Sequence, residues 1–198
     1  MVLPNQLTIL RIILTPIFLV LFLTGEPVLI QIAYLVFIIA AITDWYDGWL
    51  ARKFNYITDW GKFMDPLADK ILTSTAFIAF VIIGILQLWM VLLIIIRDLI
   101  ITLLRVYADY RKVSFMTSRT AQIKTFIQMI FLYYLLTLYT LKTFEIVNIN
   151  YNYLFEILLS PGVVYFAMLF ITLFTVVTGI TYIFSNRLLI RKLIKGEN

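Results

Sequence analysis

The chain has 198 residues, of which 63% are hydrophobic and only 14% are charged. Soluble domains carry roughly 45–50% apolar and about 25% charged residues, so this composition excludes a soluble enzyme, a disordered chain and a disulfide-stabilised scaffold. The net charge of +5 suits an anionic bilayer surface or an anionic substrate, and we expect no nucleic-acid partner.

Six apolar segments reach the length of about 20 residues that a membrane-spanning helix needs. In chain order they are Leu7–Leu23, Val28–Trp45, Leu67–Leu86, Trp89–Leu104, Ile123–Leu141 and Val163–Phe184. We expect the second and third to continue as helices beyond their apolar parts, and the first to be retained rather than cleaved as a signal peptide. The sequence therefore predicts an all-α integral membrane protein, with residues 1–198 forming one six-helix domain.

The positions of the basic residues predict the orientation of these segments. Six spans place both termini on one side of the membrane, and cytoplasmic loops carry an excess of Lys and Arg. Every basic residue except Arg97 and Lys142 lies at the segment ends or in the tail on that side. The loop Lys142–Pro161, on the other side, suits an outer interfacial segment at Asn148–Tyr153. We therefore predict a multi-pass protein of the cell (inner) membrane with cytoplasmic termini.

Five of the 11 acidic residues fall in one short stretch: Asp44, Asp47, Asp59, Asp65 and Asp69. An ionisable group in a membrane helix is costly, so it usually has a partner or a function. At about 100° per residue, one face of the second helix presents two acids, two small residues and an arginine: Asp44, Asp47, Gly48, Ala51 and Arg52. The next helix carries a second stripe, one turn apart, formed by Gly61, Asp65 and Asp69. A short loop makes the two helices antiparallel neighbours, so the stripes can converge.

Four converging carboxylates predict a site for hard divalent cations, with room for two ions. The sequence has no histidine and no cysteine, which leaves only oxygen ligands and excludes imidazole or thiolate chemistry. Two magnesium-type ions are typical of phosphoryl-transfer sites. The small residues on both stripes leave room for a bulky ligand, with tight helix packing as the alternative. Arg52 lies on the acid face, which favours contact with a phosphate over a positive-inside role.

The acid stripes resemble the signature of the CDP-alcohol phosphotransferase family: Asp44-x-x-Asp47-Gly48-x-x-Ala51-Arg52, eight residues, then Gly61-x-x-x-Asp65-x-x-x-Asp69. Every fixed position of that signature is present. Further segments resemble the bacterial phosphatidylglycerophosphate synthases within this family: Leu3–Arg11, Asp44–Gly48, Asp65–Lys70, Arg97-Asp98, Arg105 and Lys124–Met129. One position departs from that pattern, because Asp98 stands where we expect glutamate.

The resemblance implies an enzyme that transfers the phosphatidyl group of CDP-diacylglycerol to glycerol 3-phosphate and releases CMP. It implies an active site on the cytoplasmic side, contact with membrane lipids, a homodimer, and Mg²⁺ or Mn²⁺, two ions in number. The metal ligands would be Asp44, Asp47, Asp65 and Asp69, and Asp69 would also act as general base. The CDP pocket would be lined by Gly48, Ala51, Arg52 and Gly61, with Asn5 and Thr8 as further candidates. Thr8 is equally a candidate helix-start residue.

The acceptor implied by the resemblance carries its own phosphate, so basic residues are expected beside the metal site. The candidates are Arg97, Arg105 and Lys124. Arg97 lies within an apolar span, where an unpaired cation is costly, whereas the positive-inside rule alone also explains Arg105 and Lys124. Asp98 and Arg105 are seven residues apart, so they lie about 20° apart on a helix and are expected to orient each other.

Two alternative functions stay open. The same chemistry could use phosphatidylglycerol, inositol phosphate or serine as acceptor, although the basic residues favour a phosphorylated acceptor over serine. A cation transporter could use the four acids as a translocation site, but that class expects acids near mid-membrane and often repeated halves. Here the acids cluster at helix ends and no repeat is visible. Magnesium-dependent release of CMP would separate the enzyme from the transporter.

Overall fold

The computed structural model describes residues 3–54, 59–111, 119–187 and 189–190. Within these ranges it describes all side chains except those of residues 3–4, 44–45, 47–48, 50–52, 54, 59–60 and 62. The described chain forms helices only, and no strand occurs in it. The helices are α1 (Leu3–Leu23), α2 (Pro27–Phe54), α3 (Asp59–Ile82), α4 (Leu88–Tyr110), α5 (Arg119–Leu141), α6 (Glu145–Leu158) and α7 (Pro161–Ser185).

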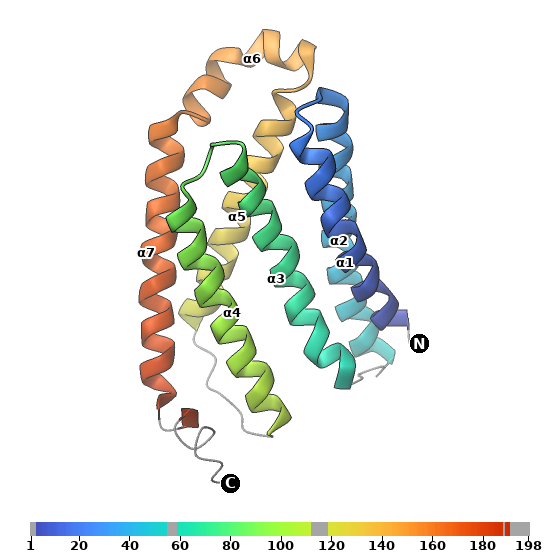
Figure 1. Cartoon of the computed structure of the whole chain (residues 1–198), viewed down its shortest axis with the longest axis vertical. Coiled ribbons are helices and arrows are strands. Elements are labelled where there is room, and N and C mark those ends of the chain that lie inside the picture. The colour runs from blue at the N-terminus through green and yellow to red at the C-terminus, as the bar shows by residue number, and fades with distance from the viewer. Residues whose placement is uncertain (1–2, 55–58, 112–118, 188, 191–198) are drawn as a thin grey trace.

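The long helices run alternately up and down a single bundle, and α6 lies across one end of it (Figure 1). The beginning of α1 and the end of α7 both lie at the opposite end, on different sides of the bundle; we call this the basic end. The described basic residues Lys53, Arg111, Arg119 and Arg187 lie at or next to the helix ends found there. α1 packs against α2 and α3, while α4 packs against α3 and α7. The even number of long helices thus brings both ends of the described chain to one end of the bundle, and their placement relative to a membrane stays a prediction.

Two tight connections at the α6 end depend on glycine. Gly25 joins α1 to α2 with a φ of 77°, and Gly84 joins α3 to α4 with a φ of 80°. A side chain in this left-handed region is strained, whereas glycine adopts it freely. No atom lies within 4 Å of the place where a Cβ would stand at either position. Backbone conformation, rather than lack of space, therefore requires glycine at these two turns.

The segment Lys142–Pro161 is a loop in the sequence analysis, and the structure corrects this interpretation. Residues Glu145–Leu158 form α6, which has a break in helical geometry at Tyr151 (φ −125°, ψ 19°). The apolar residues Ile146, Ile149 and Tyr153 are spaced three and four residues apart, which is the period of a helix, and all three are exposed. Tyr134 of α5 donates a hydrogen bond to the carbonyl of Leu158 at 2.6 Å, which ties the end of α6 to the bundle.

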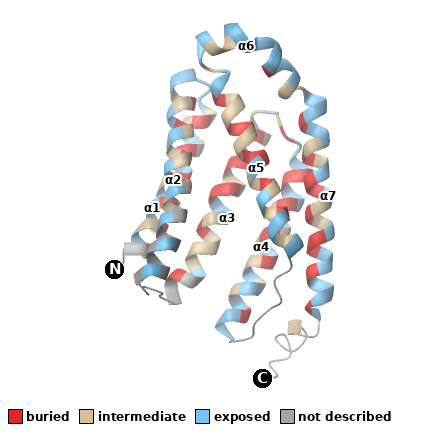
Figure 2. Cartoon of the chain, turned by 180° about the vertical axis from the view of Figure 1, so that it is seen from behind, coloured by how far each residue is buried: buried red, intermediate tan, exposed pale blue. Residues whose placement is uncertain are grey.

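Aromatic side chains fill the centre of the bundle between α1, α2 and α3. The ring centroids of Phe18 and Phe37 lie 5.3 Å apart, and those of Phe22 and Phe80 also lie 5.3 Å apart. Pairs at this separation contribute about 0.5–1.5 kcal/mol beyond the area that they bury. Figure 2 shows buried residues on the inward faces of the helices and exposed residues on the outward faces. The bundle is therefore held by an interior core of aromatic and aliphatic side chains.

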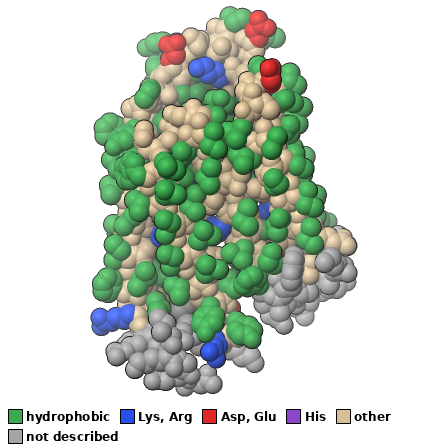
Figure 3. Space-filling view, viewed as in Figure 1, with side chains coloured by type: hydrophobic (Ala, Val, Ile, Leu, Met, Phe, Trp, Pro, Cys, Tyr) green, Lys and Arg blue, Asp and Glu red, His purple; other side chains and the backbone are tan. Residues whose placement is uncertain are grey.

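The outward faces are apolar as well. Hydrophobic side chains cover the flank of the molecule in Figure 3, and α1 alone exposes Ile13, Ile17 and Val20 along one face. A continuous exposed apolar surface of this kind marks contact with another apolar phase. Within the described residues, three helical segments are long and apolar enough to cross a bilayer: Asn5–Leu23, Arg119–Leu141 and Pro161–Ser185.

The other long helices do not meet that condition for identifiable reasons. Charged residues such as Asp69 and Lys70 interrupt α3, and Arg97, Asp98 and Arg105 interrupt α4. In α2 the apolar stretch Pro27–Thr43 ends where the described side chains reach the acid motif. The interrupting charges of α3 and α4 lie around one cavity.

Candidate functional site

The acid stripe of α3 is present as predicted. Gly61, Asp65 and Asp69 lie at successive turns of one uninterrupted helix, with Gly61 buried and both carboxylates partly exposed. Thr8 of α1, which is completely buried, donates a hydrogen bond from Oγ1 to Asp65 Oδ1 at 2.5 Å. Lys70 Nζ lies 3.0 Å from Asp69 Oδ2. A neighbouring helix and an adjacent lysine therefore orient the two carboxylates.

The acid stripe of α2 falls on side chains outside the described ones: Asp44, Asp47, Gly48, Ala51 and Arg52. Their backbone belongs to α2, which continues to Phe54 as the sequence analysis expects. Among the side chains that the structure describes, no three from His, Cys, Asp and Glu group closely enough to hold a metal ion. Convergence of the two stripes therefore stays a prediction.

The α3 stripe fits a divalent cation by its donor chemistry. Asp65 and Asp69 present carboxylate oxygens one turn apart, and hard cations such as Mg²⁺ prefer oxygen ligands. The hydrogen bond from Thr8 occupies one oxygen of Asp65 and limits the rotation of its carboxylate. Asn5, the other α1 candidate, lies one turn before Thr8 and is partly buried.

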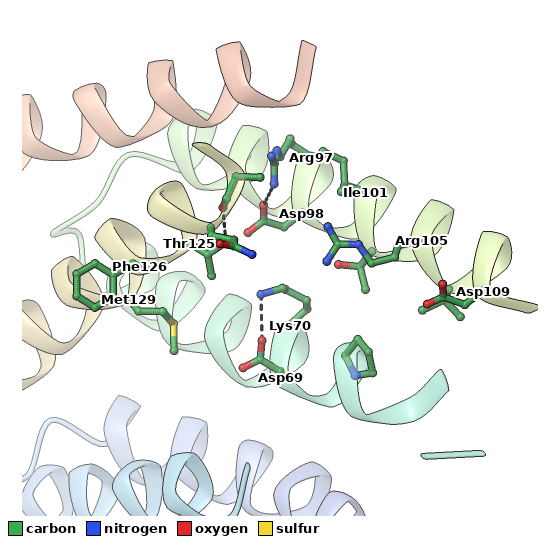
Figure 4. A pocket seen from close by; sticks show the side chains of 15 residues that line it. Asp69, Lys70, Arg97, Asp98, Ile101, Arg105, Asp109, Thr125, Phe126 and Met129 are labelled. Carbon is green, nitrogen blue, oxygen red and sulfur yellow. Dashed lines mark hydrogen bonds and ion pairs between the residues drawn. The ribbon is translucent and has the colours of Figure 1, made fainter. Parts of the chain in front are cut away.

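A cavity of about 620 Å³ opens beside Asp69, between α3, α4 and α5. Its size lies within the range of about 300–1,000 Å³ that is typical of small-ligand pockets. Figure 4 shows Arg97, Asp98 and Arg105 of α4 facing Asp69 and Lys70 of α3 across it, with apolar residues of α5 closing one side. The lining holds three basic residues (Lys70, Arg97 and Arg105) and three acidic ones (Asp69, Asp98 and Asp109). The basic side chains can bind an anionic group of a ligand, and the acids can hold the cations in place or accept protons.

Asp98 joins two cations in the wall of this cavity. Its Oδ1 accepts a hydrogen bond from Arg97 Nη1 at 3.0 Å and another from Lys124 Nζ at 2.5 Å. The Lys124 side chain is completely buried and that of Asp98 is only 5% exposed. Either charge alone would be costly in this apolar setting, so each depends on the other. Lys124 therefore lies in the interior on the far side of Asp98 and is connected to the cavity only by its ion pair with that residue.

The expectation that Asp98 and Arg105 orient each other is wrong. Among the described residues Asp98 is bonded to Arg97 and Lys124, and no hydrogen bond or ion pair joins it to Arg105, which lies about 10.5 Å further along the helix axis. Lys124 comes close because its long side chain reaches from α5 to Asp98 of α4, and a helical projection of α4 alone cannot show this contact. Arg105 instead lines the cavity and is exposed. Arg97 and Arg105 therefore line the same cavity, and their role in binding the acceptor stays a prediction.

The sequence analysis did not single out two residues that contact these charges. Lys70 is paired with Asp69 and lines the cavity, a role that its position directly after an acid of the signature could have suggested. Thr178 of α7 accepts a hydrogen bond from Arg97 Nη2 at 3.3 Å. Thr172, Thr175 and Thr178 recur every third residue and are all buried. A polar stripe of this kind in an apolar helix is a signal of an interior partner.

Comparison with known proteins identifies the family of this chain. Residues 1–184 match the family model described as CDP-alcohol phosphatidyltransferase. A protein of Bacillus subtilis (strain 168) is 40% identical over 140 residues, which cover 65% of this chain and 72% of that protein. A protein of Rickettsia typhi (strain ATCC VR-144 / Wilmington) is 39% identical over 127 residues, which cover 64% of this chain and 71% of that protein. A protein of Salmonella paratyphi A (strain ATCC 9150 / SARB42) is 38% identical over 139 residues, which cover 67% of this chain and 75% of that protein.

All three relatives are named CDP-diacylglycerol–glycerol-3-phosphate 3-phosphatidyltransferase. The match spans the signature, the cavity and most of α7. The resemblance that rests on the acid stripes is therefore confirmed, and the chain belongs to the CDP-alcohol phosphatidyltransferase family.

Proposed function

We propose that this chain is an enzyme of phospholipid biosynthesis that transfers the phosphatidyl group of CDP-diacylglycerol to glycerol 3-phosphate. Family membership and the names of the relatives support this reaction. The structural observation that carries the choice of acceptor is the cavity beside Asp69, where Arg97, Arg105 and Lys70 surround one space. A phosphorylated acceptor requires cations at this place, whereas serine does not.

In the proposed reaction Asp69 acts as general base at the cavity wall. The attacking hydroxyl of glycerol 3-phosphate gives its proton to the Asp69 carboxylate, and its oxygen bonds to the phosphorus that carries the diacylglycerol. The bond from that phosphorus to the phosphate oxygen of CMP breaks, and CMP leaves. Lys70, at 3.0 Å, holds the Asp69 carboxylate in place. In a chain without histidine, a carboxylate is the ordinary remaining base.

Arg97 and Arg105 would bind the phosphate of the acceptor. A guanidinium group offers two parallel donors to a phosphate, which fixes orientation as well as charge. Lys124 belongs to the same basic group, because its ion pair with Asp98 holds that carboxylate beside Arg97. The acceptor would then lie between the base on α3 and the cations on α4.

Divalent cations, Mg²⁺ or Mn²⁺ and two in number, would be held by Asp44, Asp47, Asp65 and Asp69. When bound, such ions supply neutralisation of the pyrophosphate and of the charge that develops on the departing CMP. Thr8 orients Asp65 for this role through its hydrogen bond. The CDP pocket would be lined by Gly48, Ala51, Arg52, Gly61 and Asn5.

The proposal includes a membrane arrangement. The long helices α1–α5 and α7 would form six spans, and residues 1–198 a single catalytic domain. Because the basic end carries the beginning of α1, the end of α7 and the cationic residues Lys53, Arg111, Arg119 and Arg187, it would face the cytoplasm, with α6 at the outer interface of the cell (inner) membrane. This orientation opens the cavity toward soluble glycerol 3-phosphate. A homodimer follows from the family resemblance.

The test is release of CMP from CDP-diacylglycerol by the purified full chain in detergent with Mg²⁺. Glycerol 3-phosphate, inositol phosphate, serine and phosphatidylglycerol are offered separately. We expect turnover with glycerol 3-phosphate alone, and a loss on the order of 10²–10⁴-fold in Asp69→Asn, which is nearly isosteric. Asp109→Asn, a change to an exposed acid at the edge of the same cavity, is the matched control.

Each other outcome has a defined meaning. Turnover with a different acceptor would refute glycerol 3-phosphate as substrate and leave the transfer chemistry standing. Absence of CMP from a protein that unfolds cooperatively would refute the enzyme and favour the cation-transport alternative. Full activity in Asp69→Asn would refute the assignment of the base.

A further inference from the structure

Arg97 is held by a helix that contributes nothing to the cavity wall. All described residues that line the cavity come from α3, α4 and α5. The side chain of Arg97, however, runs from α4 against α7, where it meets Thr178 and Gly179. The side-chain conformation of this arginine therefore depends on a helix that the ligand would not touch.

Gly179 provides the space through which the Arg97 side chain passes. A Cβ placed on Gly179 would lie 2.9 Å from Cγ of Arg97, 3.3 Å from its Nε and 3.6 Å from its Cδ. The first distance is too short for two carbon atoms, whose optimal separation is about 3.5–4.0 Å. The atom concerned is near the root of the side chain, so the clash cannot be relieved by moving the guanidinium alone. Any other residue at 179 would therefore require the Arg97 side chain or the helix backbone to shift.

Two hydrogen bonds hold the far end of the same side chain. Nη2 donates to Thr178 Oγ1 at 3.3 Å, and Nη1 donates to Asp98 Oδ1 at 3.0 Å. The Thr178 hydroxyl can donate its own proton to a backbone carbonyl of its helix, that of Phe174 at 2.9 Å, which leaves its oxygen to accept from Arg97. A flexible arginine otherwise loses much rotamer freedom on binding a ligand. Here the structure has already restricted it.

We propose that Gly179 and Thr178 are positioning residues for the acceptor site, which hold Arg97 with its guanidinium at the cavity. The proposal rests on the proposed function, because it assigns Arg97 to the phosphate of glycerol 3-phosphate. Neither residue touches the ligand, and both act through Arg97. The affinity for the acceptor is thereby set partly by α7, and substitutions in that helix change it without entering the pocket.

The test compares Gly179→Ala with Gly162→Ala in steady-state CMP release by the full-length protein. Gly162 lies on the same helix, and no atom lies within 4 Å of its Cβ position. We expect Gly179→Ala to raise KM for glycerol 3-phosphate about 10- to 100-fold, the range for losing a charge-assisted hydrogen bond. The KM for CDP-diacylglycerol should change less than about twofold in both variants. Thr178→Val, which keeps the shape and removes the acceptor oxygen, should raise the acceptor KM by a smaller factor.

The double variant Arg97→Ala/Gly179→Ala separates positioning from general packing. Arg97→Ala removes the Cγ, Cδ and Nε atoms that the new methyl group would meet, so Gly179→Ala should add nothing further to the acceptor KM. Three outcomes would overturn the proposal. The first is that the two substitutions raise the acceptor KM by independent factors that multiply in the double variant. The others are an unchanged acceptor KM in Gly179→Ala and an equal rise of that KM in Gly162→Ala.

Thermal unfolding of the wild type, Arg97→Ala, Gly179→Ala and the double variant gives a second measurement that does not depend on turnover. We expect Gly179→Ala to lower the thermal unfolding midpoint when it is introduced into the wild type. We expect no such decrease when it is introduced into Arg97→Ala, where the contact is already absent. If the wild type fails to use glycerol 3-phosphate while this coupling is present, the proposed function fails and the contact stands. Absence of the coupling would refute the contact itself.

Discussion

The ion pair between Asp98 and Lys124 yields the sharpest stability prediction. Both side chains lie in the bundle interior, Lys124 completely buried and Asp98 5% exposed, and Asp98 also accepts from Arg97. Asp98→Asn keeps the size of the side chain, removes its charge and leaves two cations facing an amide. Removing one partner of a buried ion pair costs about 3–5 kcal/mol, because the other charge stays desolvated without compensation.

This cost can be measured as a shift in the thermal unfolding midpoint. For a chain of this length each kcal/mol shifts the midpoint by about 2–4 °C, so Asp98→Asn should lower it by roughly 6–20 °C. The assay is tryptophan fluorescence during heating of the full chain in detergent, without ligands. Asp109→Asn, on the same helix and exposed, should cost less than about 0.5 kcal/mol and shift the midpoint by no more than about 2 °C.

Two further variants test the stated cause. Asp98→Glu keeps the carboxylate and should recover at least half of the lost stability. Asp98→Asn/Lys124→Met removes the stranded ammonium as well, and should be more stable than Asp98→Asn alone, since apolar replacement of a whole buried pair is often neutral. If Asp98→Asn and Asp109→Asn shift the midpoint equally, the reasoning about the buried pair is refuted.

Three other predictions concern activity. Arg105→Ala should raise KM for glycerol 3-phosphate about 10- to 100-fold with little effect on KM for CDP-diacylglycerol, and an unchanged acceptor KM would remove Arg105 from the site. Chelation with EDTA should abolish CMP release, and added Mg²⁺ or Mn²⁺ should restore it; activity that survives chelation and dialysis would contradict the metal assignment. Thr8→Val, which removes the hydrogen bond to Asp65 without changing size, should raise the Mg²⁺ concentration for half-maximal activity about 10-fold, the lower end of the range for metal-supporting contacts. An unchanged Mg²⁺ dependence would show that Thr8 does not orient a metal ligand.

The sequence by itself determined the long helices, the acid stripe of α3 and the family. Apolar length predicted the positions of all the long helices, and the helical period placed Gly61, Asp65 and Asp69 on one stripe, which the structure shows. Both inferences rest on local geometry, because residues four apart share a face in any α-helix. The signature is likewise a local pattern, so it could identify the family without knowledge of the packing.

Only the tertiary structure determined which helix faces contact each other. Thr8 and Asp65 are 57 residues apart, Asp98 and Lys124 are 26 apart, and Arg97 and Thr178 are 81 apart. The helical period says which residues point together, but not which neighbouring helix they meet, since that depends on how all the side chains interdigitate. A charged residue in an apolar span indicates that the charge has a partner, but the packing of the helices determines which residue that partner is. For this reason the sequence predicted that Arg97 needed a partner, and the fold supplied Asp98, Thr178 and the space at Gly179.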